Sequence, residues 1–153
     1  MSPRINIRRG TINDLDSLVD LETRGFTADH YSAEQFHYLL TKANCTVLII
    51  ERNRQTVGAA ILLWRKGRKV SRLYNIVIDP SYQSEGLGAK LLAACESESL
   101  AKKCQKLSLE VRIDNKGGIR FYEKHGFVIT EELPRYYSGV ASGYRMVKKL
   151  IDK

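Results

Sequence analysis

Seven stretches of the chain have the length and apolar spacing of β-strands. The clearest is residues 106–113, where the odd-numbered positions are apolar and Ser108, Glu110 and Arg112 occupy even-numbered positions. One face of that strand is therefore expected to be buried and the other to be polar. The predicted strands are residues 5–9, 45–52, 56–64, 70–78, 106–113, 128–132 and 143–150.

Four helices are predicted between these strands, because apolar residues recur there every three or four positions. The first two follow Thr11 and Ser32, which are both good N-cap residues. The third and fourth are expected over residues 86–103 and 115–125. The apolar positions that should face the core are Ile12, Leu15, Leu18, Val19 and Leu21, then Phe36, Leu39 and Leu40, then Leu87, Leu91, Leu92 and Cys95.

The order of these elements predicts a mixed α/β fold. Residues 45–52 and 56–64 flank a short turn, so they should form an antiparallel hairpin. Residues 70–78, the third helix and residues 106–113 form a strand–helix–strand unit, whose strands are parallel by the crossover rule. We expect a single domain over residues 1–153, with a central mixed sheet of about six or seven strands flanked by about four helices.

The net charge of +8 favours contact with anions. Lysine and arginine are concentrated in residues 66–72, 102–106 and 148–153. These segments are either solvated loops and helix ends, or they attract an anionic ligand or a nucleic acid. Because the chain has no helix-turn-helix or zinc-finger pattern, nucleic acid is not expected as the main partner. A cofactor with several phosphates would be attracted by the same charge.

The cysteines and histidines predict neither a disulfide framework nor a metal site. Cys45, Cys95 and Cys104 are odd in number and widely spaced, which is typical of thiols in a reducing compartment. No apolar run approaches the roughly 20 residues of a membrane span, and the N-terminal residues lack the apolar segment of a secretory signal. We therefore expect a cytoplasmic protein that does not contact the membrane.

Residues 75–92 contain the most informative local pattern. The apolar residues 76–78 predict a strand buried on both faces, which ends before Pro80. Gly86 and Gly88 follow at the start of the third helix, where unpaired N–H groups and the helix dipole favour an anion. A tight turn without a ligand is the alternative interpretation. Neither the dinucleotide fingerprint G-x-G-x-x-G nor a loop ending in G-K-[ST] is present.

Residues 83–88, Q-S-E-G-L-G, resemble Q/R-x-x-G-x-G/A, the pyrophosphate loop of the GNAT N-acetyltransferase superfamily. The preceding N-I-V-I-D-P-S-Y and the order of elements over nearly the whole chain are also similar to that superfamily. The resemblance implies the GNAT fold and acetyl-CoA as co-substrate. The cofactor-binding residues that it implies are Ile76, Val77, Ile78, Gln83, Ser84, Glu85, Gly86, Leu87, Gly88 and Asn115.

Two further segments resemble the ribosomal-protein alanine N-acetyltransferase branch of the superfamily. They are L-E-V-R at residues 109–112 and N-x-x-x-I-x-F-Y-E-K-H-G-F at residues 115–127. This resemblance implies that Glu110 and Tyr122 are catalytic. The loop after the first helix and the R-Y-Y segment resemble the parts of the family that line the acceptor site. The implied substrate-binding residues are Phe26, Tyr31, Arg135, Tyr136 and Tyr137.

Elementary chemistry leaves two interpretations for each catalytic candidate. Glu110 is either a general base, which takes a proton from the incoming ammonium, or an ion-pair partner of Arg112 on the same strand face. Tyr122 is either a hydrogen-bond donor to a departing thiolate or a core aromatic, three positions from Ile119 on one helix side. No cysteine lies in a motif that marks an acyl-enzyme nucleophile, so we expect direct transfer.

The combined pattern predicts an acetyl-CoA-dependent N-acetyltransferase whose acceptor is a protein N-terminal α-amine. An α-amine, with a pKa near 8, loses its proton more easily than lysine, with a pKa near 10.4. Two departures from the branch concern the acceptor: residues 29–31 are D-H-Y where Trp or Pro is usual, and no acidic residue lies near Ser142. A small-molecule amine, an internal lysine and a coenzyme A-binding sensor without turnover remain alternatives.

Overall fold

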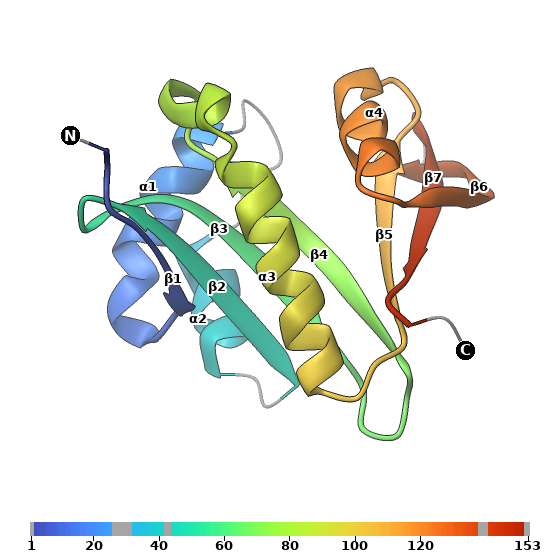
Figure 1. The fold of residues 1–153 in the computed structure, drawn as a ribbon, viewed down its shortest axis with the longest axis horizontal. Helices are drawn as coiled ribbons and strands as arrows, with labels where there is room; N and C mark the ends of the chain where they lie inside the picture. Colours follow the sequence, from blue (N-terminus) through green and yellow to red (C-terminus); the bar gives the residue numbers. More distant parts are fainter. Residues whose placement is uncertain (1, 26–31, 42–43, 138–140, 152–153) are drawn as a thin grey trace.

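A computed structural model describes residues 2–25, 32–41, 44–137 and 141–151. The expected mixed α/β architecture is confirmed: one seven-stranded sheet, in the order β1-β2-β3-β4-β5-β7-β6, forms the middle layer (Figure 1). The strands are β1 (Ile5–Arg9), β2 (Cys45–Arg52), β3 (Gln55–Leu63), β4 (Val70–Ile78), β5 (Lys106–Arg112), β6 (Val128–Tyr137) and β7 (Ala141–Lys149). The helices are α1 (Leu15–Gly25), α2 (Ala33–Thr41), α3 (Leu87–Ala101) and α4 (Lys116–Lys124), with 3-10 turns at Ile12–Asp14 and Pro80–Glu85.

Helices cover both faces of the sheet (Figure 1). On one face, α1 and α2 enclose an apolar cluster with β2 and β3, and on the other face α3 and α4 pack over a second cluster. Most predicted core positions are buried, but Ile12 is 44% exposed because it lies in the 3-10 turn before α1. No described helix is both long enough and apolar enough to cross a membrane.

The bounds of most elements agree with the prediction within two residues, but β6 is longer than expected. It continues to Tyr137, although the sequence predicts that the strand ends at residue 132. Pro134 cannot donate to a ladder, so it is tolerated only at an edge or a bulge. Both conditions hold, because β6 is the last strand of the sheet and its register against β7 shifts between Leu133 and Tyr137.

β4 and β5 pair over only part of their length. Their parallel register runs from Val70 opposite Lys106 to Leu73 opposite Leu109, while β4 continues to Ile78 and β5 to Arg112. Figure 1 shows the two strands diverging toward the end of the sheet that carries α4. In the described part of the chain, residues 74–78 and 110–112 therefore have no ladder partner on this side.

A β-bulge in β4 lies where the strands begin to diverge. Leu73 and Asn75 lie opposite consecutive residues of β3, so Tyr74 is an extra residue. The bulge reverses the alternation of the strand, because Leu73 and Ile76 both pack toward α3 while Val77 packs toward α1 and α2. The end of β4 is therefore in contact with both apolar clusters, as the sequence predicts.

Asp14 ties the start of α1 to β1. Its carboxylate accepts a hydrogen bond from the Thr11 N–H at 2.8 Å, which completes a capping box with the predicted N-cap residue Thr11. Arg8 of β1 donates two further hydrogen bonds to the same carboxylate, at 2.8 and 2.9 Å. These hydrogen bonds from Arg8 hold the pKa of Asp14 below its ordinary value of 3.8.

We predict that Asp14→Asn lowers the free energy of unfolding at pH 7 by about 1–3 kcal/mol, because charged hydrogen bonds are lost from a buried site. Since the folded pKa is depressed, the stabilisation is complete above the unfolded pKa and is lost as the pH falls through the folded pKa. Urea denaturation at pH 7 and near pH 2.5 should show the difference shrinking in acid. Asp16→Asn, at an exposed position in the first turn of α1, is the control and should cost less than about 1 kcal/mol. An equal loss at both pH values would contradict this account.

Candidate active site

Glu110 lies on β5, and its side chain is only 7% exposed. Arg72 of β4 donates a hydrogen bond from Nε to Glu110 Oε1 at 2.6 Å, and Arg145 of β7 donates one to Oε2 at 3.4 Å. Arg145 lies directly opposite Glu110 in the β5–β7 register. Arg112, the alternative partner, instead donates to Asp114 at 3.1 and 3.2 Å. A buried carboxylate is thus held between guanidinium groups of two neighbouring strands.

Arg72 also connects Glu110 to one of the predicted substrate-binding residues. Burial by itself lowers the pKa of Arg72, but the adjacent Glu110 carboxylate offsets this effect and raises it above the ordinary value. Arg72 also donates a hydrogen bond to the Tyr136 hydroxyl at 3.1 Å, and Tyr136 is 42% exposed. The sequence prediction missed both arginines that hold Glu110. The one available signal for Arg72 is that it lies within the basic segment 66–72.

These side chains line a cavity of about 610 Å³. Glu110 and Ser108 contribute to it from β5, Arg145 from β7 and Tyr136 from β6. Since Leu107, Leu109 and Val111 pack toward α3, the cavity lies on the opposite face of the sheet. A carboxylate with one side toward such a space can exchange a proton with a bound molecule.

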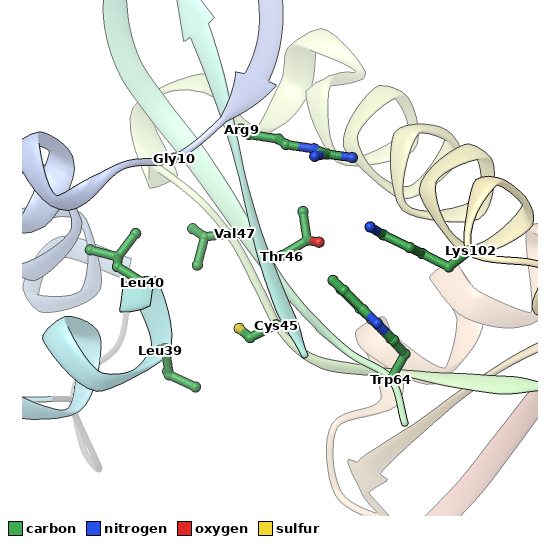
Figure 2. A pocket seen from close by; sticks show the side chains of 9 residues that line it. All are labelled: Arg9, Gly10, Leu39, Leu40, Cys45, Thr46, Val47, Trp64 and Lys102. Atoms are coloured by element: carbon green, nitrogen blue, oxygen red, sulfur yellow. The ribbon is translucent and has the colours of Figure 1, made fainter. Parts of the chain in front are cut away.

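A smaller cavity, of about 160 Å³, shares Trp64 with the larger one. Figure 2 shows Arg9 and Lys102 projecting toward the same space beside Thr46. Arg9 is bound to Glu98 at 2.7 Å, and the Lys102 ammonium lies 4.7 Å from the Trp64 ring centroid. Among the described residues that line this cavity, none is a carboxylate or a histidine. Among these described residues, the Cys45 thiol and the Lys102 ammonium are therefore the side chains that could take part in acid–base chemistry by losing a proton.

Tyr122 is half-buried on α4 and packs against the apolar cluster beneath α3. Its ring makes edge contacts with Phe121 and Phe127, at centroid distances of 5.4 and 5.7 Å. Leu109 belongs to the same cluster, and Glu110 next to it points the other way. The structure therefore places the two predicted catalytic side chains on opposite faces of the sheet.

Gly86, the N-cap residue of α3, adopts the left-handed conformation, with a φ of 75°. A Cβ at this position would meet no atom of the described chain within 4 Å, and no described side chain caps the helix. Leu87 is buried, so it offers a ligand only its backbone. The N–H groups of the first turn and the positive end of the helix dipole therefore face open space, as an anion site requires. At Gly88 a Cβ would lie 3.5 Å from Phe121 Cζ, in ordinary contact.

The rest of the predicted loop forms the exposed 3-10 turn before α3. Gln83 donates a hydrogen bond from Nε2 to the Ile78 carbonyl at 3.3 Å, so it stabilises the end of β4. Glu85 is paired with Arg52 at 2.8 Å, which balances its charge beside the helix start. Ser84 is exposed. Contacts of these three side chains with a cofactor stay a prediction.

Asn115 caps α4, because its Oδ1 accepts a hydrogen bond from the Gly118 N–H at 3.0 Å. Helix capping by itself explains why an asparagine lies at this position. The contact of Asn115 with the cofactor remains a prediction. The remaining predicted substrate-binding residues lie outside the described part of the chain: Phe26 and Tyr31 entirely, and Arg135 and Tyr137 in their side chains.

Cys95 and Cys104 are both buried in the core. Burial raises the pKa of Cys95 to about 12, and it also raises the pKa of Cys104. Neither forms a significant amount of thiolate near neutral pH. Within the described ranges, no three side chains of His, Cys, Asp or Glu gather in a way that would hold a metal ion.

Comparison with known proteins identifies the family to which this chain is similar. Residues 13–127 match the acetyltransferase (GNAT) family. A Bacillus subtilis protein, provisionally named ribosomal protein bS18-alanine N-acetyltransferase, is 27% identical over 127 residues, with 82% of each chain covered. N-alpha-acetyltransferase 30 of Dictyostelium discoideum is 27% identical over 144 residues, which are 93% of this chain and 76% of the other. The crystal structure of the ribosomal-protein-S18-alanine N-acetyltransferase from Escherichia coli has a TM-score of 0.88 at 25% identity, covering 98% of this chain and 96% of that one.

We predict that Gly86→Asp weakens acetyl-CoA binding at least about 100-fold, since like charges about 4 Å apart at an effective dielectric near 20 repel by about 4 kcal/mol. Gly67→Asp is a matched control, because Gly67 has a φ of 82° and equally open surroundings in the β3–β4 turn. Both variants carry the same backbone strain, of about 1–2 kcal/mol. Calorimetric titration should show loss of binding in the first variant only. Unchanged affinity in folded Gly86→Asp protein would reject the anion site.

Proposed function

Because the chain belongs to the acetyltransferase (GNAT) family, we propose that it transfers the acetyl group of acetyl-CoA directly to the α-amine at the N-terminus of a protein. The observation that carries the proposal is the Glu110 carboxylate, which two arginines hold at the wall of the large cavity. The names of the relatives, which specify alanine N-acetylation and N-alpha-acetylation, support an α-amine as the acceptor.

Acetyl-CoA is the donor that GNAT-family enzymes use, and it supplies an acetyl thioester. The start of α3 suits its phosphates, because Gly86 leaves the helix N-terminus accessible. The unpaired edge of β4 at Ile76, Val77 and Ile78 suits its amide-bearing arm, since backbone groups inside a sheet require hydrogen-bond partners. Asn115 lies at the start of α4, where the family resemblance implies a further contact.

Glu110 is assigned the role of proton acceptor. An amine arrives as an ammonium and must lose a proton before its nitrogen can attack the thioester carbonyl carbon. Glu110 takes that proton, directly or through a water molecule, while Arg72 and Arg145 keep the carboxylate in position. An α-amine has a pKa some two to three units below that of lysine, so its neutral fraction near pH 7 is roughly 100- to 1000-fold larger. This difference favours the α-amine.

Tyr122 is assigned the role of stabilising the coenzyme A thiolate, which is the leaving group. Its hydroxyl donates a hydrogen bond to the sulfur as negative charge builds there. Full proton transfer from a phenol of pKa near 10 to the thiolate of a thiol near 8.5 is uphill, so stabilisation is the role that the chemistry supports. Because Tyr122 and Glu110 lie on opposite faces of the sheet, donor and acceptor can approach from different sides.

The placement of the cysteines supports direct transfer. Cys95 and Cys104 are buried, and Cys45 lines the smaller cavity, which does not include Glu110. An acyl-enzyme route would need a reactive cysteine, but burial holds the pKa of Cys95 near 12. A coenzyme A-binding sensor without turnover would leave Glu110 enclosed in a packed core. Glu110 instead lines the large cavity together with Arg72, Tyr136 and Arg145, and this arrangement favours catalysis.

The test of the acceptor is a panel of short peptides with free or blocked N-termini, each with and without lysine, beside a set of small amines. We expect acetylation of each peptide with a free N-terminus, with or without lysine, and the modified nitrogen should be identified by fragmentation mass spectrometry. Acetylation of the blocked lysine peptide, or of small amines alone, would reject the α-amine and leave the acetyltransferase activity standing.

A further inference from the structure

The cavity beside Glu110 carries more positive charge than Glu110 can balance. Four arginines line it, Arg65, Arg68, Arg72 and Arg145, whereas Glu110 is the one carboxylate among its described lining residues. Arg72 and Arg145 both bind Glu110, and Arg145 also binds Glu131 at the surface. The positive charges of Arg72 and Arg145 are therefore already paired with carboxylates of the protein.

The other two arginines are different. Arg65 and Arg68 lie in the turn between β3 and β4, and both are exposed. No described residue forms an ion pair with either side chain. The turn itself is fixed, because the Arg68 N–H donates to the Arg65 carbonyl at 3.0 Å and Gly67 adopts a φ of 82°. Two guanidinium groups thus stand on an ordered turn at the cavity wall, available to a ligand.

A guanidinium group pairs well with a carboxylate, in a planar geometry with two hydrogen bonds. Arg68 lies two residues before Val70, the first residue of β4, and Arg72, which binds Glu110, lies four residues after Arg68. At about 3.3 Å per residue of extended chain, the turn lies on the order of 10 Å from Glu110. An extended peptide whose first nitrogen lies at Glu110 would therefore bring roughly its second to fourth side chains near Arg65 and Arg68.

We propose that Arg65 and Arg68 select acceptors with an acidic sequence after the first residue, so that the preferred substrate is a protein N-terminus carrying aspartate or glutamate at roughly positions two to four. This inference rests on the proposed function, since it takes the amine to be bound at Glu110. The same field disfavours a lysine- or arginine-rich N-terminus, because like charges would then meet at the turn.

Carboxylates could also come from a free amino acid or another small acidic amine. The structure favours a peptide, because Arg65 and Arg68 lie at a separate position from Glu110 along one cavity of about 610 Å³. A single small molecule that reached Glu110 with its amine would leave the turn uncontacted. A nucleic acid would also be attracted by the charge, but its phosphates have no amine to present to Glu110.

The test measures kcat/KM for three peptides of equal length and equal first residue, with aspartate and glutamate, asparagine and glutamine, or lysine at positions two to four. Free glutamate and an RNA oligonucleotide as competitor complete the panel. We expect the acidic peptide to exceed the amide peptide by about three- to thirtyfold, as two exposed ion pairs allow. The difference should lie in KM and should shrink at high salt.

The variant Arg65→Gln with Arg68→Gln should lower kcat/KM for the acidic peptide several-fold more than for the amide peptide. Lys66→Gln with Lys69→Gln is the matched control, since it removes two exposed charges of the same turn that do not line the cavity. The control should keep the full preference. If both double variants abolished the preference for the acidic peptide equally, net charge alone would explain that preference. This result would overturn the proposal.

These measurements distinguish failure of the acidic preference from failure of N-terminal acetylation. Equal acetylation of the acidic and the amide peptide by the unmodified protein would overturn the acidic preference and leave N-terminal acetylation in place. Acetylation of free glutamate but of none of the peptides would overturn both. If RNA strongly inhibited acetylation of both peptides, and the acidic and amide peptides were acetylated equally, the turn would serve a nucleic acid. This result would also overturn the acidic preference.

Discussion

The early end of the pairing between β4 and β5 is the constraint on which the rest of this structure depends. Two parallel strands in the middle of a sheet would ordinarily satisfy each other along their whole length, yet here the register stops at Leu73 opposite Leu109. The sheet stays in one piece because β3 pairs with β4 to its end, and β7 pairs with β5 to its end. Unpaired backbone inside a sheet is a reason to expect a ligand there.

The ion-pair cluster around Glu110 is better explained by chemistry than by stability. Burying a carboxylate between two guanidinium groups costs desolvation energy that the attraction largely offsets, so the net gain is small. An apolar cluster of similar volume would hold β4, β5 and β7 together at least as well. The cluster instead gives Glu110 a defined position at the wall of a cavity. The start of α3, on the other side of the divergence, offers a separate place for negative charge.

Local features of the fold could be predicted from the sequence, because their causes lie within a few residues. The capping box at Ser32 is one example, since Gln35 Oε1 accepts the Ser32 N–H at 2.7 Å. The burial pattern of β5 is another, because strict alternation allows only one orientation of the strand. The glycine loop and Glu110 were selected as candidates because short motifs there resemble those of a known family.

The partners of Glu110 could not be predicted, because they depend on register between distant strands. Arg145 lies opposite Glu110 only through the β5–β7 pairing, and Arg72 reaches it across the β4–β5 pair just before the strands diverge. The bulge at Tyr74 likewise follows from the fit of β4 against β3. No periodicity in the sequence contains this information. That no described residue forms an ion pair with Arg65 or Arg68 is also visible only in three dimensions.

The measurement that tests the central claim most directly is the pH dependence of kcat for Glu110→Gln beside Glu131→Gln. Both glutamates pair with Arg145, but Glu131 is 52% exposed and does not line the cavity. If Glu110 accepts the proton, Glu110→Gln should lower kcat about 100-fold or more and leave the affinity for acetyl-CoA unchanged. The remaining activity of this variant should rise with pH only as the free amine loses its proton. Glu131→Gln should retain the wild-type profile. A Glu110→Gln enzyme with the wild-type rate across the pH range would show that another group removes the proton.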